Sequence, residues 1–280
     1  MALPPLHGFC LFMLSFADRT EQKLLQPTDP DPVEWVNEPG RSEILLVCEH
    51  AGRAVPAALG DLGIAPEEMD RHIAYDVGAE GLARGLAERL GAPLVLQRYS
   101  RLVIDCNRPL EALDCVIGES DGTVVPVNGD VSEGDRRRRF DEIHQPFHRA
   151  INDTLDQRQI DGKPRFLVTV HSFTPVMRAT GAVRDFELGL LYNLDARLAE
   201  RLAETFSAAN PDVTVKLNQP YVVDDQSDYT IPQHGERRGI PHVLIEVRND
   251  LINDDRGQQE WADRLAGPLR LAVDSLEGNA

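Results

Sequence analysis

Short apolar runs alternate along the chain with longer segments in which apolar residues recur every three or four positions. A run of four to six apolar residues is typical of a buried strand, and the longer spacing is typical of an amphipathic helix. The pattern predicts strands at 44–48, 94–97, 101–105, 166–170, 186–191 and 242–247, and helices at 77–90, 140–155, 194–206 and 258–276. Strands separated by helices favour an α/β fold with a mainly parallel sheet that is covered on both faces.

Glycine and proline mark the ends and interruptions of these elements. Gly91 is expected to end the helix at 77–90, and Pro146 to bend or split the helix at 140–155. The stretch 110–134 is rich in Gly, Asp and Val and is predicted to run over the surface and over the site. We expect residues 41–280 to form one domain, and residues 1–40 to be a poorly ordered N-terminal extension.

Charge and cysteine content narrow the class of protein. The net charge is −17 and the isoelectric point is near 4.8, which disfavours nucleic acid and anionic membranes as partners but leaves room for a small anionic substrate in a locally basic cleft. The four cysteines form no CxxC pair, so thiolate zinc sites and redox pairs are not expected. The apolar run 9–16 is short and follows no Lys or Arg, which favours a cytoplasmic protein over an exported one.

Two histidines occupy equivalent places at the ends of predicted strands. His50 follows the strand at 44–48, and His171 follows the strand at 166–170. The carboxyl ends of parallel strands meet at one edge of the sheet, where α/β proteins bind their ligands, so the two imidazoles are predicted to share one metal ion. Asp76 is the predicted third ligand, although it is equally suited to cap the helix that follows, and His72 competes with it. Glu49 is a weaker candidate, because strand alternation sends its side chain to the opposite face.

Glu246 comes late in an apolar run, where an ionised carboxylate is costly to bury without a partner or a metal. We interpret it as the group that takes a proton from water and passes it to a leaving amine. The alternative is a salt bridge with Arg248, since alternate strand residues share one face.

The segment 101–109 supplies candidates for holding an anion. Arg108, with Asn107 beside it, is predicted to bind a substrate carboxylate, because a guanidinium can donate two parallel hydrogen bonds to that group. A second clamp or an oxyanion donor is expected from Arg101, Arg178 or Arg248. The simpler alternative is that Arg108 pairs with Asp105 or Asp76 and only braces loops. His234, in a polar loop before the last strand, is a further candidate substrate contact, whereas His144 and His148 are interpreted as packing or supporting residues.

Five segments in this order resemble the N-formylglutamate amidohydrolase family: 49–52, 76–79, 100–108, 171–175 and 244–251. The resemblance implies a phosphorylase/hydrolase-like three-layer α/β/α sandwich with a mainly parallel mixed sheet. It also implies zinc, or another divalent metal, and removal of a formyl group from an acidic amino acid such as N-formyl-L-glutamate, a step of histidine catabolism. The resemblance implies that Asn107–Arg108 matches the pair that grips a substrate carboxylate in related hydrolases, that His171 matches their second zinc histidine, and that Glu246 matches their catalytic glutamate. The relatives' first motif, His-x-x-Glu, has Arg53 here in place of glutamate, so Asp76 as the replacement ligand is our inference.

These observations predict a metal-dependent amidohydrolase in which Glu246 and Arg101 act on the amide and Arg108 and Asn107 hold the substrate. One alternative is a related deacylase or peptidase for a different N-acyl substrate. Another is a non-catalytic protein that binds acidic metabolites through Arg108 and Arg101 without a metal.

Overall fold

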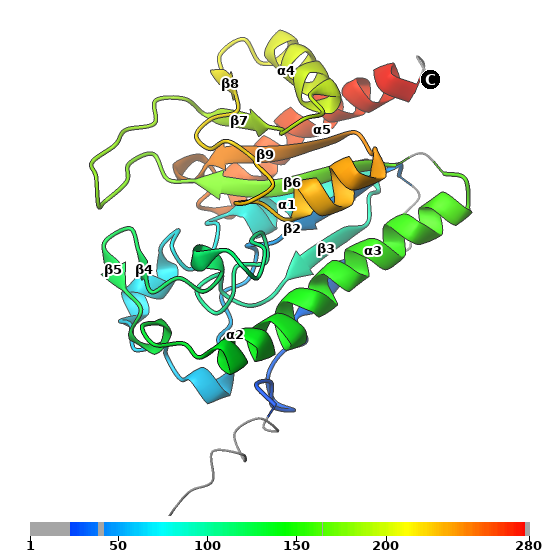
Figure 1. Cartoon of the computed structure of the whole chain (residues 1–280). Coiled ribbons are helices and arrows are strands. Elements are labelled where there is room, and N and C mark those ends of the chain that lie inside the picture. The colour runs from blue at the N-terminus through cyan, green and yellow to red at the C-terminus, as the bar shows by residue number, and fades with distance from the viewer. Residues whose placement is uncertain (1–22, 39–41, 164, 278–280) are drawn as a thin grey trace, which may run out of the picture.

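The computed structural model describes residues 23–38, 42–163 and 165–277. Within them, seven strands form one twisted sheet in the order β1-β3-β2-β6-β9-β7-β8 (Figure 1). Their bounds are β1 Val33–Val36, β2 Ile44–Cys48, β3 Leu94–Gln97, β6 Phe166–Phe173, β7 Leu188–Leu191, β8 Val215–Leu217 and β9 His242–Arg248. The central strands β3, β2, β6 and β9 are mutually parallel, whereas β1 pairs with β3 and β7 pairs with β9 in antiparallel fashion. The predicted mainly parallel mixed sheet is confirmed.

Helices cover both faces of this sheet. The helices are α1 Ala79–Leu90, α2 Glu133–Arg139, α3 Gln145–Ile160, α4 Arg197–Ala209 and α5 Asp255–Glu277. Alternate residues of β2 face opposite sides of the sheet. Leu46 packs in one hydrophobic cluster with α1, α4 and α5, and Leu45 packs in the other cluster with α3. The result is the predicted three-layer α/β/α sandwich, with α3 in front of the sheet and α5 behind it in Figure 1.

The helical boundaries follow the sequence signals closely. Gly91, which adopts the left-handed conformation at φ 59°, ends α1. Pro146 lies in the first turn of α3, directly after a π-helical turn at Phe140–His144 that separates α3 from α2. A proline cannot donate an intrahelical hydrogen bond, and here it lies at the junction where the π-helical turn meets α3.

Two predictions about secondary structure were wrong. Residues 101–105 form a turn rather than a strand, because the Ser100 hydroxyl bonds Ala74 O at 2.7 Å and the Ser100 carbonyl accepts from Val103 N at 2.9 Å. The boundary predicted for the poorly ordered N-terminal segment, residue 40, was also wrong. Residues 33–36, inside the segment expected to be poorly ordered, form edge strand β1 and pair with β3. Residues 1–22 lie outside the described part of the chain.

The stretch 110–134 carries little regular structure apart from the hairpin of β4 Glu119–Ser120 and β5 Thr123–Val124. In Figure 1 the arrowhead of β6 points to the side of the molecule where this hairpin lies. The stretch therefore belongs to the end of the sheet where the parallel strands finish.

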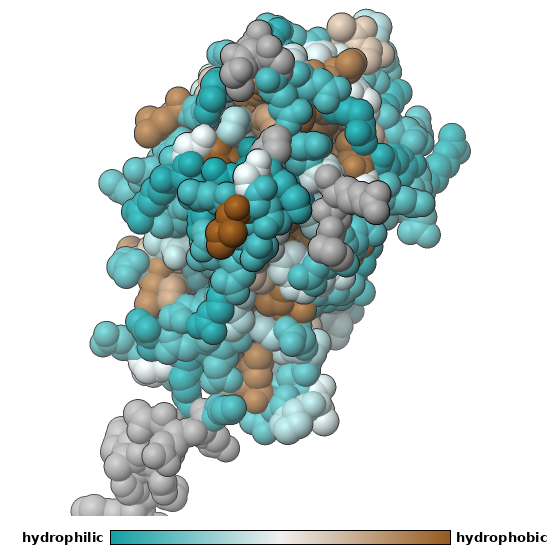
Figure 2. Space-filling view, turned by 90° about the vertical axis from the view of Figure 1, so that its right-hand side faces the viewer, coloured by the Kyte–Doolittle hydropathy of each residue, from teal (hydrophilic) through white to brown (hydrophobic). Residues whose placement is uncertain are grey.

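The face of the molecule drawn in Figure 2 is predominantly hydrophilic. Polar side chains predominate on it, and apolar ones are scattered. Among the described residues, no helix has the length and apolar character needed to cross a membrane.

Candidate metal and catalytic site

Two imidazoles and a carboxylate converge where β2 and β6 end. His50 follows β2 by two residues, and His171 lies within β6, which continues past its predicted end to Phe173 because it pairs in register with β9. Asp76 precedes α1, and its backbone N–H donates to His50 O at 2.9 Å. Gly52 lets the chain after His50 pass close to the backbone of Arg98, since a Cβ there would lie 1.9 Å from Arg98 O.

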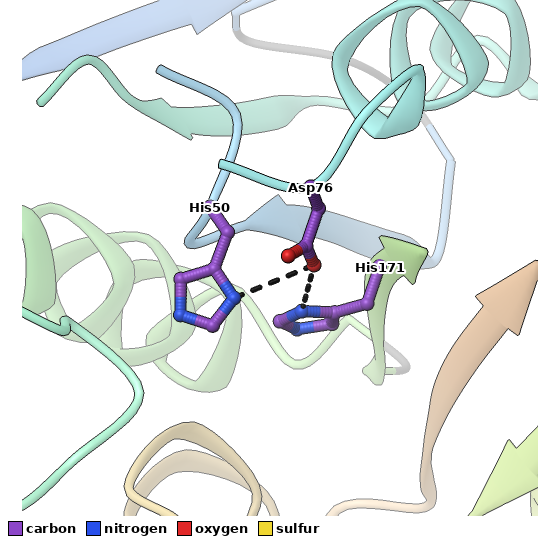
Figure 3. Close-up of side chains that lie close together, drawn as sticks. All are labelled: His50, Asp76 and His171. Atoms are coloured by element: carbon purple, nitrogen blue, oxygen red, sulfur yellow. Dashed lines mark hydrogen bonds and ion pairs between the residues drawn. The ribbon is translucent and has the colours of Figure 1, made fainter. Parts of the chain in front are cut away.

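The three side chains share one centre (Figure 3). Asp76 Oδ2 lies 2.8 Å from His171 Nδ1 and 3.4 Å from His50 Nδ1, and the two rings are 4.9 Å apart. One ligand atom from each of the three residues lies within 4.8 Å of the other two. All three residues are buried. The structure therefore brings together the three residues proposed from the sequence as a metal site.

Asp76 does not act as the helix cap that was its alternative. The N-cap position of α1 is Gly78, and no side chain bonds the first turn. The Asp76 carboxylate instead accepts a hydrogen bond from Ser172 N at 3.3 Å and faces Arg101 at 3.4 Å.

The outer nitrogen of each imidazole faces a second buried carboxylate. His50 Nε2 lies 2.7 Å from Asp105 Oδ1, and His171 Nε2 lies 3.0 Å from Glu49 Oε2, although this second pair does not meet hydrogen-bond geometry. Metal-binding histidines characteristically present one nitrogen to the ion and the other to a carboxylate or carbonyl. Sequence reasoning missed these two roles. The only signals were that Glu49 directly precedes His50 and that Asp105 is four residues from Arg101.

The charges of the cluster favour the binding of a cation. Burial raises the pKa of Asp76, but His50 and His171 overcome it and hold that pKa below its usual range. Burial lowers the pKa of His171, but Glu49 and Asp76 raise it well above the ordinary value of an imidazole. The carboxylates of Glu49, Asp76 and Asp105 carry three negative charges. The guanidinium of Arg101 offsets one of them, so two remain. A divalent cation between neutral imidazoles would balance them, and two nitrogens with one oxygen are a donor set that zinc accepts.

Glu246 lies beside this cluster on the neighbouring strand. It is the register partner of His171, it is 5% exposed, and its Oε2 has no hydrogen-bond partner. Burial raises the pKa of Glu246 to about 8; Asp76 adds to this rise, and His171 opposes it. The salt bridge with Arg248 that was its alternative does not form, because Arg248 pairs with Asp250 at 2.8 Å and lies 3.6 Å from Glu187.

A cavity of about 350 Å³ opens over the cluster. Among the residues singled out from the sequence, its walls include His50, Asp76, Arg101, Asn107, Arg108, His171 and Glu246. Ile117, Ser120 and Asp121, from the stretch predicted to run over the site, also contribute. A larger cavity of about 820 Å³ lies along α3, but it contains no histidine and is lined mainly by residues of α3 and of the β1 edge of the sheet. We therefore place the site in the smaller cavity.

Three of the predicted residues lie away from this cavity. Arg178 has a side chain that is 63% exposed and pairs with Glu68, and Arg248 pairs as described above. His234 is buried against His148, to which its Nε2–H donates at 2.9 Å.

The segment 106–108 is held in place by histidines and by a loop. His148 Nε2–H donates to Cys106 O at 2.6 Å, and His144 Nε2–H donates to Arg108 O at 2.9 Å. The Asn107 side chain donates to Asp228 at 2.9 Å and accepts from the backbone N–H groups of Tyr229 and Thr230. The amide of Asn107 is thus used within the protein, and the histidines serve as the supporting residues expected for His144 and His148.

This histidine cluster predicts an acid-sensitive stability. Burial lowers the pKa of His144 to about 4 and that of His234 to about 3. The unfolded chain takes up these protons near pH 6.5, so the free energy of unfolding should fall as pH decreases from about 6.5 toward 4, by about 1.4 kcal/mol per pH unit for each such histidine. Replacing His144 by Gln should reduce this slope, measured by urea unfolding between pH 5 and 6.5. Parallel curves for wild type and variant would contradict the assignment.

The fold and the cluster define a class: an α/β protein with a buried His–Asp–His group, suited to a metal, at the carboxyl ends of its parallel strands. The pattern of the family described as N-formylglutamate amidohydrolase matches residues 42–253, and the chain belongs to that family.

Individual relatives agree with this assignment. The chain is 29% identical over 184 residues to an N-formylglutamate deformylase of Pseudomonas putida, an alignment that spans 58% of this chain and 65% of the relative. The crystal structure of gene product Atu2144 from Agrobacterium tumefaciens is 35% identical, with a TM-score of 0.85 over 91% of this chain and 100% of that chain. An N-formylglutamate amidohydrolase from Ralstonia eutropha JMP134 shares the fold, at 20% identity and a TM-score of 0.62 over 89% of this chain and 100% of that chain.

Proposed function

We propose that this chain hydrolyses the N-formyl, or another short N-acyl, amide of an amino acid with the help of a divalent metal, zinc in the first instance. The observation that carries the proposal is the convergence of His50, Asp76 and His171, with a carboxylate behind each imidazole and Glu246 on the adjoining strand. The relatives' printed names supply the formyl amide as the bond to test first.

His50, Asp76 and His171 would hold the metal. When bound, such a metal polarises a carbonyl and makes water more acidic. The proton transfers are carried out by a side chain of the protein. Glu246, in its ionised form, takes the proton of the attacking water and returns it to the departing nitrogen.

Two arginines position the substrate. Arg101 pairs with Asp105 at 2.7 Å and lines the cavity. Its guanidinium can therefore stabilise negative charge on the acyl oxygen. Arg108 Nε pairs with Asp114 at 2.8 Å. Its Nη1 donates to Ser227 O, so Nη2 remains as the donor for the α-carboxylate of the amino acid, which fixes the amide over the cluster.

The test is a metal analysis coupled to an assay. Protein purified without chelator is expected to carry about one metal ion per chain and to release formate from N-formyl amino acids. Removing the metal with dipicolinate should abolish formate release, and zinc should restore it. Full activity after the metal has been removed would overturn the proposed role of the cluster, and the absence of hydrolysis in the zinc-loaded protein would overturn the proposed activity.

A further inference from the structure

The cavity has an apolar wall on the side of β7 and β9. Leu244 and Glu246 are alternate residues of β9 and therefore share one face of the sheet, and Leu191 of β7 is the register partner of Leu244. Val223 packs with both leucines in a small hydrophobic cluster that is separate from the two main cores. Val222, which is 68% exposed, continues this wall to the mouth of the cavity. An apolar surface thus begins directly beside the proposed catalytic glutamate.

The charges around the cavity are predominantly negative. Six carboxylates contribute to its walls, against the two guanidiniums of Arg101 and Arg108. Both arginines already pair with carboxylates of the chain, at 2.7 Å and 2.8 Å respectively. The six carboxylates are Asp76, Asp105, Asp114, Asp121, Asp228 and Glu246. Arg101 bonds Asp105 and Asp76 through all three of its nitrogens, and Arg108 keeps only Nη2 for a ligand. Even with a divalent cation in place, the described residues of the walls offer no further arginine or lysine for a second substrate carboxylate.

From the apolar wall and this charge balance we infer that the substrate is the N-formyl or short N-acyl derivative of a neutral, apolar amino acid. Its side chain would lie against Leu191, Val223 and Leu244, and only its α-carboxylate would be held by Arg108. The inference rests on the proposed function and specifies its substrate class. An acidic side chain would place an unpaired carboxylate on apolar surface, which is unfavourable. Water adds its oxygen to the acyl carbon as the C–N bond breaks, and the amine leaves with a proton, so no further reactant is needed.

A direct competition between substrates tests the inference. Zinc-loaded full-length protein is expected to show a kcat/KM for N-formyl-leucine at least tenfold above that for N-formyl-glutamate. An equal value, or a preference for the glutamate derivative, would overturn the inference while leaving the proposed hydrolysis intact. If neither compound is hydrolysed, calorimetric titration with free leucine and free glutamate decides. Tighter binding of leucine supports the apolar pocket, and tighter or equal binding of glutamate overturns it.

A single substitution should move this preference in a known direction. Val222→Arg adds a guanidinium at the exposed edge of the apolar wall, and it is expected to shift the leucine-to-glutamate ratio of kcat/KM toward glutamate by about tenfold. Leu271→Arg is the matched control, because it adds the same charge at an apolar residue of α5 that is 59% exposed and lies outside the cavity. The ratio should not change in the control. An unchanged ratio in the Val222 variant, or an equal shift in both, would show that this wall does not contact the substrate side chain.

Discussion

Replacing Glu246 by Gln is expected to lower kcat by about 10² to 10⁴-fold, the range typical of a lost general acid–base group. The glutamine amide has nearly the same shape but cannot accept a proton from water. Glu246 Oε2 has no hydrogen-bond partner, and the raised pKa of Glu246 keeps its carboxyl largely neutral in the metal-free protein. The substitution should therefore leave the fold and the proposed ligands His50, Asp76 and His171 in place.

Three measurements on the same preparation separate this role from a structural one: kcat for formate release, zinc content and the midpoint of thermal unfolding. Only kcat should change. Glu260→Gln, at an exposed position of α5, is the matched control and should behave as the wild type. A Glu246 variant that keeps more than a tenth of the wild-type kcat would remove this residue from the proposed mechanism.

The convergence of His50 and His171 could be predicted from the sequence because strand ends follow from hydrophobic patterning. His50 and His171 come after apolar runs, and parallel neighbouring strands place such residues at one edge of the sheet. The pattern also places Glu246 next to His171, once β6 and β9 are neighbours. Asp76 had two possible roles, and only the conformation of the preceding loop, which bonds His50 O, decided between them.

What could not be predicted lies in segments without periodicity. The apolar run at 101–105 is typical of a strand, but side-chain bonds from Ser100 and the Arg101–Asp105 pair fold it into a turn. That turn places Asp105 behind His50, a role that no spacing rule indicates. Val222 and Val223 of the apolar wall belong to an irregular loop. Val223 packs against Leu191 and Leu244, which the antiparallel pairing of β7 with β9 brings together. Side-chain hydrogen bonding in loops depends on tertiary contacts that a one-dimensional pattern does not contain.

The second large effect is expected at the two aspartates that face His50. Asp76→Asn removes a charged proposed ligand from the centre of the cluster. Asp105→Asn leaves the three proposed ligands in place, but it changes the partner of the outer nitrogen of His50, which lies 2.7 Å away, and weakens the ion pair with Arg101. Loss of such an outer partner typically weakens metal affinity by about 10–100-fold. We expect Asp105→Asn to fall in that range and Asp76→Asn to weaken zinc binding by at least about tenfold more.

Competition with a chromophoric zinc chelator measures both affinities, and thermal unfolding with and without zinc confirms that each variant folds. In the wild type, zinc at 100 times its Kd should stabilise the folded chain by about 2.7 kcal/mol, because the ion binds only the native state. This stabilisation should largely vanish in the Asp76 variant and remain measurable in the Asp105 variant. Both variants remove one buried carboxylate charge that faces His50, so a general loss of charge would affect them equally. Equal weakening, or a larger effect at Asp105, would therefore exclude Asp76 as the third ligand.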